Sequence, residues 1–348
     1  MRYRADEPEL DAYYADIEQV HLQPLWAMSG LLTPTPRVKA VPHRWSAGDL
    51  QKLAARAGEL VPLDRGGDRR VLAMSNPGLD GAPYISGTLW AAVQFLQAGE
   101  VAPAHRHTPG ALRFVLDGDG AYTLLDGDPV AMSRGDLVLT PSWVYHEHHN
   151  PSSHPMMWLD VLDLPMVATL DAVFFEEGPS EEAEASVAPR SMSERRFGQG
   201  AGLVPTGVSA AVHDRPHSPL MVYRWAETDA ALDSLLEVGD GQEAELRYRD
   251  PSRGRDVMPT LRCEMRRMVG GHTTAIDQQT GTRVCAVLDG VGTARLGGQE
   301  FALTPGDVFV VPSWCEHQLE ARSTLDVFTT SDAPVLDALG LFRRRKVV

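Results

Sequence analysis

Two segments decide the fold of this chain: Gly99-Glu-Val-Ala-Pro-Ala-His105-Arg-His107 and Gly135-Asp136-Leu-Val-Leu-Thr-Pro141-Ser-Trp143-Val-Tyr-His146-Glu-His148-His149-Asn150. In a β-strand, side chains two residues apart point to the same face of the sheet. His105 and His107 can therefore direct two imidazoles into one cavity, and His146 can add a third from a later strand. Neutral imidazole is a good ligand for Fe, Zn, Cu and Ni. The sequence therefore predicts a metal site of three histidines.

The spacing within each segment is also that of a known superfamily. The segments resemble the paired cupin motifs, G-x5-H-x-H and G-x5-P-x-[GW]-x2-H-x3-N, and both match at full spacing. This resemblance implies a jelly-roll β-barrel. Most metal cupins place a glutamate four or five residues after the second histidine, where this chain has Ala111 and Leu112. A neutral three-histidine site would leave open metal positions for O2 and for an anionic, bidentate substrate.

The composition favours a soluble, cytoplasmic protein. The 348 residues fit one large domain or two of ordinary size, and the formal net charge is -15. A charge of this sign argues against nucleic acid and anionic membrane surfaces as partners. Cys263, Cys285 and Cys315 lack metal-site or disulfide-framework spacing, which predicts a reducing compartment. The sequence also lacks an apolar signal region or a run of about eighteen apolar residues.

Helices are predicted before the strands begin. Residues 6–28 carry apolar side chains at helical spacing, and Ser46 with Asp49 has the spacing of a capping box at the start of a second helix. From Arg69 onward the pattern changes to short apolar runs separated by Gly, Asp and Pro turns, which is typical of a jelly-roll. The predicted strands of the first half are 71–74, 85–95, 112–116, 122–125, 137–140 and 156–162.

The second half of the chain repeats the first. Val115-Leu-Asp-Gly-Asp-Gly120 matches Val287-Leu-Asp-Gly-Val-Gly292, and the matched motif positions are Gly135-Asp136 with Gly306-Asp307, Pro141-Ser-Trp143 with Pro312-Ser-Trp314, and His146 with His317. An internal repeat of this size indicates a duplicated domain. The predicted fold is therefore all-β dominated: a bicupin of two jelly-roll barrels with flanking N-terminal helices. The predicted parts are a helical segment packing on the barrels at 1–68, a catalytic cupin at 69–175, an acidic linker at 176–202 and a C-terminal cupin at 203–348.

The two copies differ at the positions that carry chemistry. Asp277 and Gln279 stand where the first copy has His105 and His107, and Cys285 stands in place of Arg113, while His317 is retained. A hard metal on Asp277, Gln279 and His317 is conceivable, because oxygen ligands suit such ions. The interpretation we favour is a metal-free structural barrel with a degenerate metal motif.

A longer set of matches resembles a particular family, the gentisate 1,2-dioxygenases. The most specific part is His105-Arg-His-Thr108 followed by Ala111-Leu-Arg113-Phe, and the other matches are Gln23-Pro-Leu-Trp26, Ala40-Val-Pro-His43-Arg-Trp45, Arg69-Arg70-Val-Leu, Asn76-Pro-Gly-Leu, Phe174-Phe175-Glu and Pro334-Val-Leu-Asp-Ala-Leu-Gly-Leu341. The resemblance implies one Fe(II) per subunit in the N-terminal cupin. It also implies extradiol-type ring cleavage of gentisate with O2 to maleylpyruvate, in aromatic hydrocarbon catabolism, by a homotetramer.

The resemblance also assigns roles to residues. His105, His107 and His146 would hold the metal, and Arg113 would bind the carboxylate of the aromatic acid or developing charge on oxygen. A surface salt bridge is the alternative interpretation of Arg113. Arg69 would complement the acid in the same way, although Arg70 is an equal candidate by sequence.

Five further residues are assigned to the pocket or to catalysis. His148 shares the parity of His146 and would bind the distal hydroxyl and move its proton, unless it is only a supporting or surface histidine. Asp160 lies in an apolar strand and needs a partner, which a histidine or arginine near the metal would supply; a buried structural aspartate is nearly as well supported. Trp90, Ala92 and Gln94 share one parity and would line the pocket, with core packing as the rival interpretation.

Two alternatives to gentisate cleavage remain open at this stage. The first is a dioxygenase of the salicylate or 1-hydroxy-2-naphthoate type, because such substrates differ by only one or two polar contacts. The second is a non-catalytic, ligand-binding bicupin, since this barrel supports many activities. A DNA-binding module is not visible in the sequence.

Overall fold

The computed structural model describes residues 8–61, 70–178, 187–200, 202–206 and 215–347. It divides into two compact units, residues 1–37 and 38–348. The first unit contains α1 (Pro8–Gln19) and the short 3-10 helix η1 (Leu25–Ala27). The prediction of one helix over 6–28 is therefore wrong in its length. His21 has a left-handed φ of 57° and Pro24 follows, and neither continues an α-helix.

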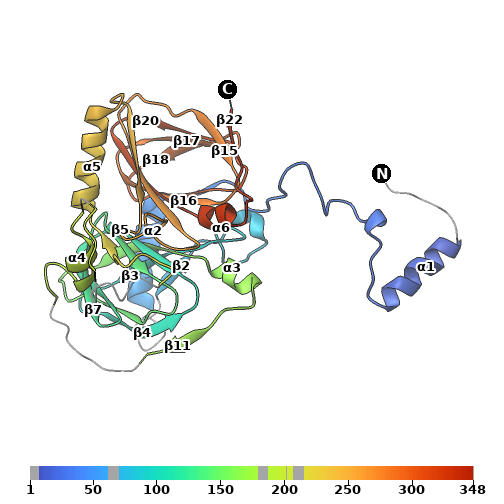
Figure 1. Ribbon diagram of the computed structural model, residues 1–348, viewed down its shortest axis with the longest axis horizontal. Coiled ribbons are helices and arrows are strands. Elements are labelled where there is room, and N and C mark those ends of the chain that lie inside the picture. The colour runs from blue at the N-terminus through green and yellow to red at the C-terminus, as the bar shows by residue number, and fades with distance from the viewer. Residues whose placement is uncertain (1–7, 62–69, 179–186, 201, 207–214, 348) are drawn as a thin grey trace. The chain divides into compact units, whose positions relative to one another are not determined.

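The second unit contains two barrels of antiparallel strands, cyan to green and orange to red in Figure 1, and confirms the predicted bicupin. The N-terminal barrel pairs the sheet β12-β8-β5-β10-β3-β2 with the sheet β11-β4-β9-β6-β7. Its strands are β2 (Val71–Ala73), β3 (Trp90–Leu96), β4 (Val101–His107), β5 (Ala111–Asp117), β6 (Asp119–Leu125), β7 (Asp128–Ser133), β8 (Leu137–Thr140), β9 (His146–His149), β10 (Met156–Leu162), β11 (Phe175–Glu177) and β12 (Val222–Tyr223).

The C-terminal barrel repeats this arrangement with the sheets β1-β19-β16-β21-β14-β13 and β18-β17-β20-β15-β22. Its strands are β1 (His43–Trp45), β13 (Glu243–Tyr248), β14 (Arg262–Met268), β15 (Ile276–Gln279), β16 (Arg283–Asp289), β17 (Gly292–Leu296), β18 (Gln299–Leu303), β19 (Val308–Val311), β20 (His317–Ala321), β21 (Leu325–Ser331) and β22 (Arg344–Val347). The helices of the second unit are α2 (Ala47–Leu60), η4 (Pro77–Leu79), α3 (Leu164–Thr169), α4 (Met192–Phe197), α5 (Trp225–Val238) and α6 (Ala333–Ala338).

The strands predicted in the first half are found, with one shortened. The prediction for 85–95 is wrong over its first five residues, because β3 begins only at Trp90. There the Ser86 hydroxyl accepts the backbone N–H groups of Thr88 and Leu89, which closes a turn. Ile85 and Leu89 are nonetheless fully buried. Their apolar character indicated burial correctly but not a strand.

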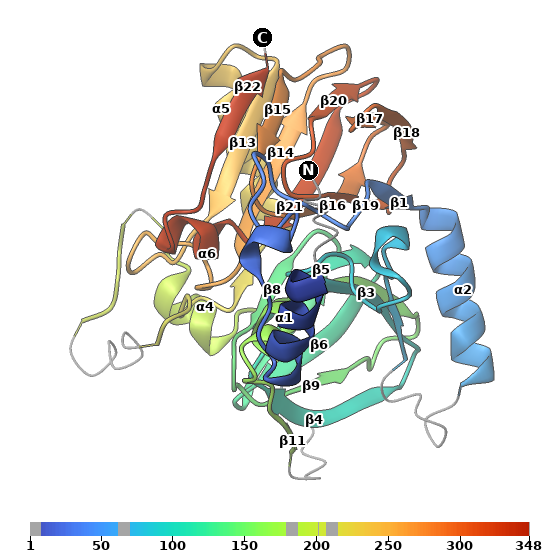
Figure 2. The ribbon, with the colours of Figure 1, turned by 90° about the vertical axis from the view of Figure 1, so that its right-hand side faces the viewer.

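Each barrel receives one strand from the segment that precedes the other barrel. β1 lies before the N-terminal barrel in sequence but pairs with β19, and β12 lies before the C-terminal barrel but pairs with β8. Each exchanged strand leads directly into a 14-residue helix, α2 after β1 and α5 after β12. Figure 2 shows α2 beside the two barrels.

The Gly-Asp pair of each cupin motif anchors the exchanged strand. Asp136 accepts from the guanidinium of Arg224 at 2.8 Å and from the backbone N–H of Trp225 at 2.9 Å. Asp307 likewise accepts from Arg44 at 3.0 Å and from the backbone N–H of Ala47 at 2.7 Å. Each carboxylate therefore also sits at the positive end of a helix, where negative charge is favourable. The repeated aspartates bind the two halves of the chain to each other.

A continuous core joins the barrels. Phe114 of β5 stacks on Phe328 of β21 with ring centroids 4.1 Å apart and an interplanar angle of 5°, and both are fully buried. Helix α2 packs on β3 and buries Leu50 and Ala54. Its N-cap is Ser46, whose side chain accepts the Asp49 N–H, as the sequence predicts. Together these contacts make the barrels one packed body.

Part of the segment predicted as an acidic linker is ordered and packed. Helix α4 begins with a full capping box of Ser191 and Glu194, and Phe197 is buried. The Glu194 carboxylate also accepts from Arg224 at 2.8 Å. Glu194 is thus a helix cap and an ion-pair partner, while most of the acidic run that predicts the linker, residues 179–186, lies outside the described residues. The domain boundaries derived from the sequence stay a prediction. Among the described helices, none has the length and apolar character needed to span a membrane.

Candidate active site and metal centre

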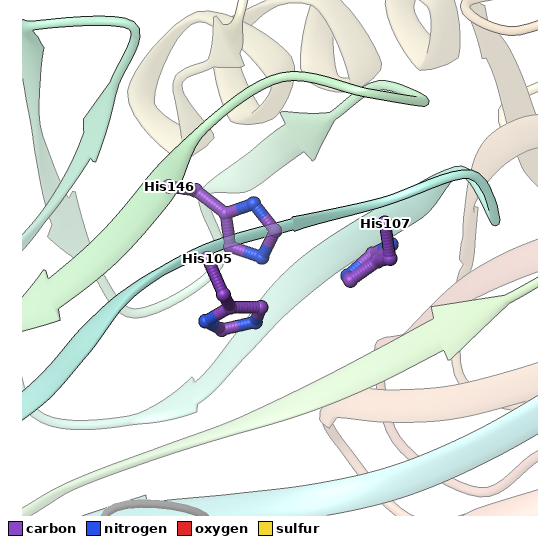
Figure 3. Close-up of side chains that lie close together, drawn as sticks. All are labelled: His105, His107 and His146. Atoms are coloured by element: carbon purple, nitrogen blue, oxygen red, sulfur yellow. The ribbon is translucent and has the colours of Figure 1, made fainter. Parts of the chain in front are cut away.

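Three histidines converge inside the N-terminal barrel, as Figure 3 shows. His105 and His107 lie two residues apart on β4, and His146 on β9 pairs directly with His105 across the sheet. Their candidate ligand atoms all lie within 4.8 Å of one another. The backbone N–H of Trp143 donates to the His107 carbonyl at 2.8 Å, with Trp143 in the left-handed conformation (φ 64°). This turn fixes the start of β9 against the end of β4.

Backbone carbonyls orient all three imidazoles. In each ring Nδ1 lies 2.7–3.0 Å from a carbonyl oxygen two residues away, so Nδ1–H donates and Nε2 is left as the ligand atom. The carbonyls belong to Pro103, Pro109 and Val144. The Nε2 atom of His146 is buried and has no hydrogen-bond partner among the described residues. A buried acceptor of this kind is costly unless a ligand satisfies it.

Burial keeps two of these histidines, His107 and His146, in the form that binds metal. Burial lowers the pKa of His107 to about 4, with the charges of His105 and Arg113 acting in the same direction and the Pro109 hydrogen bond opposing them. Burial, followed by the charge of Arg113, also holds the pKa of His146 well below its usual value. Neutral imidazoles with preset tautomers fit a divalent transition metal, because only the deprotonated nitrogen coordinates.

His148 lies on the same strand face as His146, and His149 on the other. The Nδ1 atom of His148 is 2.8 Å from the hydroxyl of Thr123, while its Nε2 atom is buried without a partner in the described part of the chain. Burial, then the charge of Arg113, holds the pKa of His148 well below its usual value. His149 instead stacks on Tyr122 and lies 3.1 Å from Glu147. The parity argument for His148 therefore describes its position correctly.

Arg113 and Asp160 form a buried ion pair on the facing sheet. They are direct partners across β5 and β10, with Nε and Oδ1 3.2 Å apart and with side chains 4% and 6% exposed. The Arg113 guanidinium also donates to the Thr140 hydroxyl, and the Trp158 indole N–H donates to Asp160 at 3.2 Å. Burial raises the pKa of Asp160 to about 6, although Arg113 and Trp158 oppose the shift. Arg113 is thus buried in the barrel and is not in a surface salt bridge.

The three residues predicted to line the pocket share the face of that ion pair. On β3, Ala92 pairs with Asp160, Gln94 with Trp158, and Trp90 with Leu162. Ala92 is fully buried and Gln94 is 7% exposed. The barrel therefore brings these side chains, the ion pair and the histidines around one interior.

By sequence, Arg69 and Arg70 are equal candidates for binding the substrate carboxylate. Arg69 lies outside the described residues. Arg70 is buried, pairs with Glu100, and donates to the carbonyls of Gly58 and Val61 near the end of α2. Arg70 therefore fastens α2 to the barrel and is not a free group for a substrate.

Sequence reasoning missed three supporting side chains: Thr123, Thr140 and Trp158. Trp158 could have been found, because it lies two residues before Asp160 on the same strand and so shares its face. Thr123 pairs with His148 across β6 and β9, and Thr140 lies on β8 beside β5. Those contacts depend on strand register, which no local signal in the sequence specifies.

The fold and the histidine cluster together define a bicupin with a metal-binding centre in its first barrel. Residues 92–162 and 264–330 each match the family described as Cupin domain. A gentisate 1,2-dioxygenase of a Streptomyces species is 49% identical over 96% of this chain and 94% of its own length. A 5-aminosalicylate 1,2-dioxygenase of a Comamonas species is 35% identical over 97% and 91%. The crystal structure of a salicylate 1,2-dioxygenase from Pseudoaminobacter salicylatoxidans, as an adduct with gentisate, has a TM-score of 0.94, 43% identity and 99% and 95% coverage.

The chain belongs to the gentisate 1,2-dioxygenase family of ring-cleaving bicupins. The family resemblance found in the sequence is therefore confirmed.

Proposed function

We propose that this protein cleaves the ring of gentisate (2,5-dihydroxybenzoate) with O2 to give maleylpyruvate. The observation that carries the proposal is the pairing of a neutral three-histidine cluster with the buried Arg113–Asp160 pair in one barrel interior. An aromatic acid supplies the carboxylate that such an arginine recognises. The 49% identity to a named gentisate 1,2-dioxygenase supports this substrate over salicylate or hydroxynaphthoate.

One Fe(II) per subunit is the cofactor that we propose for His105, His107 and His146. The donor set fits this metal because each Nε2 is deprotonated and a neutral triad leaves the ion its full charge. When bound, Fe(II) supplies the redox chemistry by which O2 reacts with an aromatic ring, and the protein supplies orientation and electrostatics.

Arg113 is the group that we assign to the substrate carboxylate and to the negative charge that develops on oxygen. Its guanidinium is permanently charged and is held by Asp160 and Thr140, so it loses little freedom on binding. In this proposal Asp160 orients the Arg113 guanidinium, and its carboxylate partly neutralises the buried positive charge. Arg69 is proposed as a second carboxylate contact.

His148 is the proton carrier of the proposed reaction. If Nδ1–H donates to Thr123, Nε2 carries the free lone pair and can accept the proton of the distal hydroxyl. Its lowered pKa keeps the imidazole neutral, so Nε2 retains its lone pair. Trp90, Ala92 and Gln94 would line the pocket beside the ring.

The direct test is O2 uptake by anaerobically purified, Fe(II)-loaded protein with gentisate and salicylate in parallel. We expect uptake with gentisate, formation of maleylpyruvate, and loss of both in His105→Ala. Uptake with salicylate at a comparable rate would make the protein a broader salicylate-type enzyme. Protein with its metal bound and no uptake with either acid would favour the ligand-binding bicupin.

A cytoplasmic homotetramer is the assembly that we propose. Several apolar side chains of the first unit are exposed, among them Trp26 at 65% and Leu32 at 92%. Exposed apolar side chains in such number are typical of a protein interface. Light scattering after size exclusion tests this proposal, and a mass near 38.0 kDa would contradict it.

A further inference from the structure

The C-terminal barrel contains a cavity of about 190 Å³ at the place where the N-terminal barrel has its histidines. Asp277 on β15 pairs with His317 on β20, as His105 pairs with His146. Arg283 and Arg344 also line this cavity, together with the apolar side chains of Val311 and Val327. The lining therefore combines charge and an apolar wall.

In this barrel the guanidinium of Arg283 lies against His317, at the position where a metal ion would bind. Arg283 is the first residue of β16, as Ala111 is of β5, and its side chain is only 10% exposed. Its Nη1 atom lies 2.9 Å from Nε2 of His317 and its Nη2 atom lies 2.9 Å from Nδ1, while Nδ1 of His317 also lies 2.9 Å from the carbonyl oxygen of Asp277. Nδ1–H therefore donates to that carbonyl, and Nε2 accepts from Arg283. The ring nitrogens of His317 are both engaged, which leaves neither for a metal.

Arg283 has more donors than partners. Its Nε–H group is buried and has no hydrogen-bond partner in the described structure. The carboxylate nearest to it, Asp277, lies 3.4 Å away and is shared with Arg344, which is closer at 2.8 Å. A buried charged donor without a partner is costly, so its retention points to a ligand.

Neighbouring arginines do not share this excess, because each has its own carboxylate. The pairs within 3.0 Å are Arg247 with Glu264, Arg262 with Asp256 and Asp337, and Arg266 with Glu245. Arg283 and Arg344 have only Asp277 between them. A local positive field is also seen at His317, whose pKa is lowered to about 3 by burial and then by Arg283.

We propose that this cavity binds a small organic carboxylate through the unpartnered Nε–H of Arg283, with Arg344 at its half-exposed mouth. A planar carboxylate matches the planar fork of arginine. Apolar side chains, among them Phe309, Val311 and Val327, line part of the cavity and would contact a compact apolar or aromatic body, which an inorganic ion lacks. A cavity smaller than the roughly 300 Å³ of ordinary drug-sized pockets limits the ligand to a small acid. The site is separate from the histidine cluster and does not depend on ring cleavage.

Calorimetric titration of the metal-loaded, full-length protein with benzoate tests the proposal. We expect two classes of benzoate site per chain in the wild type. Arg283→Met should remove one class, and Arg113→Met the other, so failure of the active-site assignment would leave the Arg283-dependent class intact. Arg283→Lys keeps the charge but lacks the fork, and should weaken the same class by at least about tenfold. A titration unchanged by both Arg283 variants would overturn the proposal.

Two further measurements keep the test independent of how the variants fold. Crystals of the wild type with 4-bromobenzoate should give a bromine anomalous peak in the cavity beside Arg283. A peak at the histidine cluster alone would overturn the proposal. Inorganic phosphate should not displace benzoate from this class, and equal displacement by phosphate would show a general anion site and reject an organic carboxylate.

Discussion

The two barrels have the same strands but place their arginine differently relative to the histidine that they share in sequence. In the N-terminal barrel, the three imidazoles of His105, His107 and His146 converge, and Arg113 lies on the facing sheet. In the C-terminal barrel, Arg283 donates directly to the one retained histidine. The facing pair Arg113–Asp160 is matched by Cys285 and Thr329, whose side chains lie 3.6 Å apart. The same duplicated barrel thus holds a candidate metal centre in one copy and a fixed guanidinium in the other.

The largest difference in metal affinity and activity should be that between His146→Ala and His317→Ala, which replace the matched histidines of the two barrels. His146→Ala removes a ligand, so we expect metal affinity to fall by more than about 100-fold and ring cleavage by about 1000-fold or more. His317→Ala should retain about one metal per chain, because its ring is engaged with Arg283. Elemental analysis and O2 uptake measure both. Equal metal loss in the two variants would mean that the second barrel also holds metal.

A second contrast is between Arg113 and Cys285, which occupy the matched position in the two barrels. Arg113→Met should lower kcat/KM for gentisate by about 100-fold, since a buried, charge-assisted contact to the substrate is lost. Cys285→Ser, at the matched position, should change kcat/KM by less than about twofold, because Cys285 lies in the C-terminal barrel, away from the three histidines. Steady-state kinetics with a thermal melt for each variant distinguishes lost binding from lost folding. An Arg113→Met enzyme with unchanged KM and kcat would remove Arg113 from the site.

The acid limb of the pH profile should belong to Asp160. Its raised pKa of about 6 means that the carboxylate is charged at pH 7 and gains a proton as the pH falls through about 6. Protonation removes the partner that orients Arg113, so kcat/KM should fall below that pH. Asp160→Asn should lower kcat/KM by about tenfold and flatten this limb. If the limb persists in Asp160→Asn, another group controls it.

The smallest effect should be the coupling free energy between Phe114 and Phe328, which stack where the two barrels meet. Phe114→Leu and Phe328→Leu should each destabilise the fold, because both rings are fully buried and stacked. A double-mutant cycle by denaturant unfolding should give a coupling free energy of about 1 kcal/mol. Additive effects of the two substitutions would mean that the stack contributes only ordinary burial.

Local rules in the sequence predicted the histidine cluster and the duplicated fold. His105, His107 and His148 follow from strand parity, and the repeated Gly-Asp and Pro-Ser-Trp motifs indicate the second barrel. The same rules could not show that Arg283 reaches His317, because β16 and β20 belong to different sheets and the contact depends on how these sheets face each other. They also could not show that β1 and β12 change barrels, since a short strand carries no signal of its partner. The Arg69 prediction stays open.

The strand exchange has a consequence for how the chain is made. During synthesis the N-terminal barrel has an open edge at β8 until Val222 and Tyr223 emerge, and β1 waits for Val308–Val311. Contacts this distant in sequence slow folding, and open edges invite wrong pairing. The first barrel therefore cannot mature alone on the ribosome, and truncation after residue 175 should yield an aggregating fragment rather than a smaller enzyme.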